Sequence, residues 1–161
     1  MIPRGIRNNN PLNIRRSESH QARLNGRVST DEDKVNIQRS KDQWQGLRAV
    51  QTDPSFCQFE TLEYGWRAAF KLLTHTYYHT YGLNTIRAII SRWAPANENN
   101  TRAYIANVSR LTGIDPDEPL GAPSEKPARW MMLGIAMAIQ ENGTGSLDYF
   151  AMFRGWMMAQ E

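Results

Sequence analysis

The sequence predicts a mainly helical α+β fold, with a small loop-rich or β lobe over residues 1–60 and a helical lobe over residues 61–161. Two observations carry this prediction. Apolar residues recur at helical spacing from Leu62 onward, whereas the first lobe holds only short apolar segments between polar turns. A ten-residue apolar run, from Trp130 to Ile139, indicates a buried central helix. Two lobes of this kind are expected to leave a cleft between them.

Length and charge bound the possibilities. With 161 residues, a single domain over residues 1–161 is expected. The formal charge of +3 fits an anionic partner, such as cell wall, nucleic acid or a membrane surface, without choosing among them. The first residues lack the apolar segment of a secretory signal, so we expect synthesis in the bacterial cytoplasm and delivery by other means.

The first lobe is expected to be built from turns and short strands. Asn8 to Pro11 indicates a tight ordered turn, because asparagine side chains bond nearby backbone and tolerate left-handed geometry. Residues 17–43 are polar and predict a long loop, with a short strand at 35–37. The three segments expected to form a small sheet are residues 12–15, 44–50 and 56–60.

About five helices are expected in the second lobe. The first begins after the capping residue Thr61 and ends at Gly82, and the second ends at Ala94-Pro95. A third stops at Gly113. The central helix starts at Pro127, and a short C-terminal helix follows it.

Glu141 is the one ionisable residue near the end of the central helix, just before the probable stop at Gly143. A carboxylate there faces the negative end of the helix dipole, and partial burial also disfavours its charge. Both effects favour the protonated form, which suits a general acid. The alternative, which position alone favours, is an exposed carboxylate at a frayed helix end. Glu63 has the opposite setting, because it opens a helix and the dipole stabilises its charge.

No metal or organic cofactor is implied. His75 and His79 are four residues apart on one predicted helix, but the sequence HTYYH lacks the glutamate of a zinc protease motif. Cys57, the single cysteine, lies in an apolar segment and is expected to be a small buried residue. No recognition-helix motif is present, and acidic residues are interspersed with the basic ones, so nucleic acid is not an expected partner. A membrane is not expected either, because the ten-residue apolar run is too short to span a bilayer.

Several segments together resemble a known family. RGIRNNNPLNIR, WQG, FCQFETLEYGWRAA, IISRWAPANENNTRAYIANVSRLTG and AIQENG occur in that order. This set resembles a group of phage and prophage virion proteins labelled structural protein P5-like or described as lytic enzymes. The resemblance covers most of the chain except residues 17–43 and the last helix. It implies a virion setting, with other virion proteins as partners.

A second, more distant resemblance is to lysozyme-like cell-wall glucosaminidases. Asn9 to Ile14 looks like the asparagine-rich turn and strand of those enzymes, and Trp44-Gln45-Gly46 looks like their W-x-G patch. Their helix ending in a catalytic glutamate comes first, whereas here residues 134–143 look like that helix near the other end of the chain. The resemblance implies a circularly permuted lysozyme-like domain. It predicts that Glu141 lies close to Asn9–Asn13 and to Trp44.

The resemblance implies a peptidoglycan-degrading glycosidase, a muramidase, glucosaminidase or lytic transglycosylase, with Glu141 as general acid. It would act in the virion or in the host periplasm and cell wall. Hydrolysis needs a second carboxylate, for which Glu60, Glu63 and Glu98 are candidates. Glu63 is preferred, because it opens the helix that is expected to pack beside the cleft. Without a second carboxylate, the substrate's own groups would complete the reaction. The residues expected to contact the sugar chain or stand near it are Asn10, Asn13, Trp44, Glu60, Glu98 and Tyr104.

A rival interpretation belongs to a different class. The chain would be a non-catalytic virion structural or adaptor protein with the same fold, and Glu141 would be a structural carboxylate. Replacing Glu141 by glutamine would then change no activity.

Overall fold

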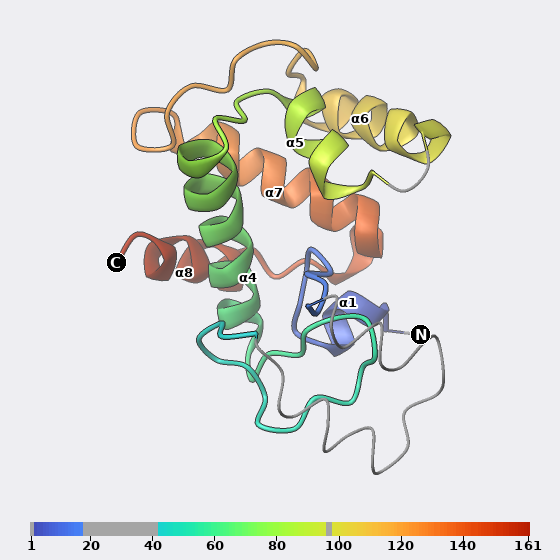
Figure 1. The fold of residues 1–161 in the computed structure, drawn as a ribbon, viewed down its shortest axis with the longest axis vertical. Coiled ribbons are helices and arrows are strands. Elements are labelled where there is room, and N and C mark those ends of the chain that lie inside the picture. The colour runs from blue at the N-terminus through green and yellow to red at the C-terminus, as the bar shows by residue number, and fades with distance from the viewer. Residues whose placement is uncertain (1, 18–41, 96–97) are drawn as a thin grey trace.

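The computed structural model describes residues 2–17, 42–95 and 98–161 (Figure 1). Helices dominate these residues. In chain order they are α1 (Arg4–Arg7), α4 (Leu62–Lys71), the π-helix η1 (Leu72–Thr80), α5 (Ile86–Trp93), α6 (Glu98–Thr112), α7 (Pro127–Asn142), the 3₁₀ turn η2 (Thr144–Ser146) and α8 (Tyr149–Ala159).

The predicted α+β fold with a β lobe is wrong. Across the described parts of the chain, none of the predicted segments 12–15, 44–50 and 56–60 forms a strand. What remains of the expected sheet is two isolated antiparallel bridges, one between Arg15 and Phe56 and one between Leu47 and Phe59. The strand predicted at 35–37 lies outside the described residues.

Side-chain amides add to the few backbone hydrogen bonds that join these segments. Asn10 is fully buried, and its Nδ2 donates to the carbonyl oxygens of Ile14 at 3.0 Å and Cys57 at 2.9 Å. These are backbone acceptors that a strand ladder would use. Asn13 also interrupts the extended run, because its φ of 52° lies in the left-handed region. Residues 8–16 and 56–60 are therefore held together without a continuous strand ladder.

The five predicted helices are present. Thr61, Thr85 and Asp148 begin α4, α5 and α8, and each side chain accepts a hydrogen bond from the backbone N–H three residues later, at 3.3, 3.1 and 3.0 Å. The third helix is longer than predicted. It begins at Glu98, well before the first apolar residue of its periodic stretch, Tyr104.

α7 runs through the middle of the helical region (Figure 1). α6 packs along it, α1 lies against its C-terminal end, and α4 packs against α8. The predicted apolar run is buried over most of its length, although Met132 is 40% exposed. Trp66 stacks on Phe70 at 5.4 Å, and Phe70 meets Trp156 edge-on at 4.9 Å. Within the described residues, no helix has both the length and the apolar character that crossing a bilayer requires.

The helix that starts at Leu62 changes character half-way. The sequence predicts one continuous α-helix up to Gly82, but from Leu72 to Thr80 the backbone is a π-helix. The wider turn is closed by bonds such as that from Tyr81 N–H to the carbonyl of Thr76, at 3.0 Å. Such segments occur often at functional sites.

The asparagine turn meets α4 backbone to backbone. Asn9, also in the left-handed region at φ 52°, donates from Nδ2 to the carbonyl oxygens of Phe59 at 3.1 Å and Glu60 at 3.2 Å. Its own carbonyl oxygen lies 1.9 Å from where a Cβ on Gly65 would stand. Glycine at position 65 is therefore a condition for this contact.

Asp53 fixes the first residues of the chain. It is buried and accepts from Arg4 Nε at 2.7 Å and Nη2 at 2.6 Å, from Asn8 Nδ2 at 2.9 Å, and from the backbone N–H groups of Ser55 and Phe56. Burial by itself raises the pKa of Asp53, but these hydrogen bonds outweigh it and lower the pKa to about 2.

We expect Asp53 to stabilise the fold most above pH 4. Because its folded pKa of about 2 lies below the ordinary aspartate pKa of 3.8, the stabilisation is present above pH 3.8 and is lost as the pH falls toward 2. Asp53→Asn should lower the free energy of unfolding by about 1–3 kcal/mol at pH 7. Urea denaturation across this pH range tests this.

Asp117→Asn is the matched control, because Asp117 pairs with Arg87 on the surface. It should change the free energy of unfolding little at any pH. Equal losses in the two variants would contradict the role given to Asp53.

Candidate functional site

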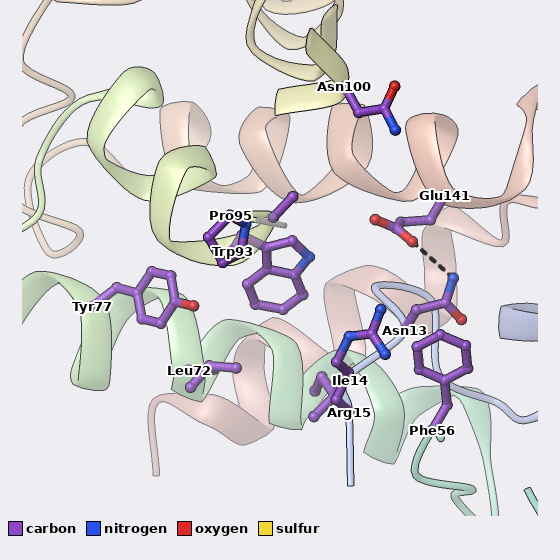
Figure 2. A pocket seen from close by; sticks show the side chains of 11 residues that line it. Asn13, Ile14, Arg15, Phe56, Leu72, Tyr77, Trp93, Pro95, Asn100 and Glu141 are labelled. Carbon is purple, nitrogen blue, oxygen red and sulfur yellow. Dashed lines mark hydrogen bonds between the residues drawn. The ribbon is translucent and has the colours of Figure 1, made fainter. Parts of the chain in front are cut away.

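A cavity of 470 Å³ lies at the C-terminal end of α7, between the asparagine turn, the π-helix and the end of α5 (Figure 2). Glu141 projects into it. An adjoining pocket of 330 Å³ shares Ala94, Asn100 and Glu141 and extends to Tyr104 on α6. The residues that line the larger cavity are Asn13, Ile14, Arg15, Phe56, Leu72, Tyr77, Trp93, Ala94, Pro95, Asn100 and Glu141.

Each oxygen of the Glu141 carboxylate has its own donor. Asn13 Nδ2 donates to Oε1 at 2.8 Å, and the Tyr104 hydroxyl donates to Oε2 at 3.0 Å. Tyr104 is buried, and burial, followed by the nearby Glu141 charge and this hydrogen bond, raises its pKa well above 10. The phenol therefore keeps its proton at neutral pH.

Residues on both sides of Glu141 anchor the end of α7. Gln140 Oε1 accepts from Asn107 Nδ2 on α6 at 3.0 Å. Asn142 Nδ2 donates to the carbonyl oxygen of Pro11 at 2.7 Å. The carboxylate is thus held between α6 and the asparagine turn, and its position does not depend on a frayed helix end.

Gly5 on α1 makes room for this arrangement. A Cβ at position 5 would stand 2.4 Å from Asn142 Oδ1, 2.8 Å from Asn13 Oδ1 and 2.9 Å from the Asn10 carbonyl oxygen. Both side-chain oxygens are buried and accept no hydrogen bond from the described residues. A larger residue at position 5 would therefore displace the two asparagines that flank Glu141.

The predicted proximity of Glu141 and Asn13 is confirmed, although 128 positions separate them in the chain. Tyr104, also predicted to lie near the site, contacts the same carboxylate. Trp44 does not line the cavity and packs partly buried against the core. The catalytic and sugar-binding roles given to these residues stay predictions.

Other predicted site residues lie elsewhere. Asn10 is fully buried, with its amide committed to backbone groups, so it is not available to a ligand. Glu63 accepts from Arg154 Nε at 3.3 Å, between α4 and α8, and lines neither pocket. Glu60 is exposed and also lines neither. Glu98 opens α6, and its side chain lies outside the description.

The aromatic wall of the cavity was not predicted from the sequence. Tyr77 and Trp93 meet edge-on at 5.9 Å, and Leu72 lies on the same side (Figure 2). Both aromatic residues fall on the apolar stripes of their helices. A stripe of this kind has the same sequence pattern whether it faces the core or a cavity, so no sequence signal separates the two.

Other titratable groups fit structural roles. Cys57 is buried, as predicted, and burial raises its pKa to about 12, so it is not a nucleophile at neutral pH. His75 and His79 lie with ring centroids 5.9 Å apart. Within the described part of the chain, no three histidine, cysteine or carboxylate residues cluster as a metal site would require.

These features define a helical protein built around a hydrogen-bonded carboxylate in a cavity. Its sequence is similar to that of a bacteriophage protein. Protein P5 of Pseudoalteromonas phage PM2 is 34% identical over 153 residues, which cover 95% of this chain and 79% of the phage protein. The chain therefore belongs to the protein P5 family of phage proteins. No family model matches the sequence. The name of the relative states no activity.

Gly5→Ala should destabilise the protein by about 1–3 kcal/mol, because the new methyl group must displace Asn13 or Asn142. Thermal or urea denaturation measures this. Gly145→Ala is the control, since a Cβ there would meet no atom within 4 Å. If the two variants were equally stable, the packing described at Gly5 would be incorrect.

Proposed function

We propose that the protein degrades peptidoglycan as a glycosidase in which Glu141 is the general acid. The observation that carries the proposal is the position of Glu141. It lies in a 470 Å³ cavity, and both of its oxygens are held by donors from distant parts of the chain. A fixed carboxyl group in a concave site is what proton transfer to a glycosidic oxygen requires.

The two donors fix the orientation of the Glu141 carboxyl group. The Asn13 amide nitrogen donates to Oε1, and the Tyr104 hydroxyl donates to Oε2. Each carboxyl oxygen keeps a second lone-pair site, which can be directed at a substrate oxygen in the cavity. Asn13 and Tyr104 thus hold in place the group that would act as the acid.

The cavity favours a lytic transglycosylase over a hydrolase. Among the lining residues that the structure describes, Glu141 is the one carboxylate, and Glu60 and Glu63 lie outside the cavity. Glu141 would protonate the leaving oxygen as the C1–O bond breaks. The C6 hydroxyl of the same sugar would then attack C1 and lose its proton to the Glu141 carboxylate. The product is a 1,6-anhydro sugar. This route needs neither water as a reactant nor a second carboxylate as a catalyst.

The cavity walls suit a sugar ring. Trp93 and Tyr77 offer aromatic surface on one side, and Asn13 offers a polar edge on the other. A phage must pass the host cell wall, so membership of a phage family gives such an activity a place in the virion or the host periplasm.

Glu141→Gln should lower the release of soluble fragments from purified peptidoglycan by about 10²–10⁴-fold, because glutamine cannot supply the proton. Mass analysis should show anhydro ends in the wild-type products. Glu63→Gln is the matched control, because it removes a carboxylate that pairs with Arg154 outside the cavity.

The outcomes separate the interpretations. Reducing ends would indicate hydrolysis and a water-activating group. If Glu63→Gln folded normally but lost activity, Glu63 would be a catalytic residue after all. No release by the wild-type protein would reject the glycosidase.

A second candidate function is a non-catalytic virion structural or adaptor protein. One observation favours it. α8 exposes an apolar stripe on the side away from α4, in which Phe150 is 77% exposed and Met157 is 66% exposed. Tyr149 and Phe153 belong to the same stripe. A surface of this kind is typical of a contact with another protein, which here would be a virion component.

Phe150→Ser combined with Phe153→Ser should then reduce incorporation of the protein into particles, measured by immunoblotting purified virions. The stability of the isolated protein should not fall, because both side chains are exposed. Exposed Leu111→Ser on α6 is the control. Unchanged incorporation of the double variant would count against this surface.

A further inference from the structure

Arg15 lines the cavity and carries a positive charge. The mechanism proposed for Glu141 gives this charge no function. The Arg15 guanidinium stands 5.1 Å from the centre of the Phe56 ring, and both side chains line the cavity (Figure 2). Arg4 approaches the same ring at 4.6 Å, but Asp53 neutralises Arg4. Arg15 has no carboxylate partner among the described residues.

The backbone around Arg15 is fixed. Cys57 N–H donates to the Ile14 carbonyl at 2.9 Å, and Arg16 N–H donates to the Ser55 carbonyl at 2.8 Å. Arg15 is therefore held on both sides, two residues beyond Asn13, which binds Glu141. Figure 2 shows its guanidinium directed toward the space between Trp93 and Asn13. The backbone of Arg15 is thus fixed beside the cavity, and its exposed guanidinium rests on the Phe56 ring.

We propose that Arg15 binds a carboxylate carried by the glycan, so that the site selects anionic strands over neutral ones. This proposal rests on the proposed function and adds the substrate class. A guanidinium fork matches a carboxylate in two parallel hydrogen bonds. A neutral β-1,4 polymer of N-acetylglucosamine has the same linkage but offers no such group. The carboxylate is either the free lactyl group of muramic acid or a carboxylate of its peptide stem.

Arg15 also makes an anionic ligand compatible with Glu141. Whenever Glu141 is ionised, a second negative charge in the same cavity is repelled. The Arg15 charge offsets this repulsion on the side of the cavity that Phe56 and Asn13 form. A neutral ligand needs no such compensation, so its binding should not depend on Arg15.

Binding is tested without turnover in Glu141→Gln protein by isothermal titration. The three ligands are peptide-free tetrasaccharides with free lactyl groups, tetrasaccharides with peptide stems, and neutral chitotetraose. Adding Arg15→Gln should weaken the carboxylate ligands about 10–100-fold, the loss expected for a charge-assisted hydrogen bond, and leave chitotetraose unchanged. Arg15→Lys should recover part of the loss. Arg87→Gln, which removes an equal charge outside the cavity, should change nothing.

Whichever carboxylate ligand loses affinity identifies the source of the recognised group. Equal weakening of all three ligands, or no weakening, overturns the role of Arg15. If the role of Arg15 is overturned but the wild-type protein still releases anhydro sugars, the proposed function is supported without the proposed role of Arg15. If the wild-type protein neither binds nor cleaves any glycan, both proposals fall.

Discussion

The structure depends on the side-chain amides of residues 8–13. They join the start of the chain to Asp53, to the backbone of residues 57–60 and to Glu141. An amide donates and accepts without carrying charge, so it can be buried at little cost once its partners are present. This is why segments that lack a strand ladder still pack at a fixed distance from the helices.

The same turn that holds residues 57–60 in place also builds the site. Asn13 adopts a left-handed conformation that costs an asparagine less than most residues, and this conformation turns its amide toward α7. Its partner is the Glu141 carboxylate at the end of α7, which Tyr104 holds from the other side. Strain of this kind persists only where surrounding contacts enforce it, here through Gly5 and Asn142. Stability and the geometry of the candidate acid are therefore coupled.

The helices could be predicted because apolar spacing and capping residues such as Thr61 and Asp148 act locally. The proximity of Asn13 and Glu141 followed from the order of motifs that the resemblance supplied. The absence of strands could not be foreseen. A short apolar segment has the same sequence pattern whether its backbone N–H and C=O groups bond to a neighbouring strand or to asparagine side chains. Gly5 and Trp93 were missed for a related reason. Their importance lies in contacts with distant residues that sequence spacing does not encode.

The separation of 128 positions between Asn13 and Glu141 has a consequence for synthesis. A chain that emerges from the ribosome N-terminus first exposes the asparagine turn long before its partner helix exists. The nascent protein cannot assemble the carboxylate site until α7 has been translated, and whatever chemistry Glu141 performs is withheld from the cell during that interval.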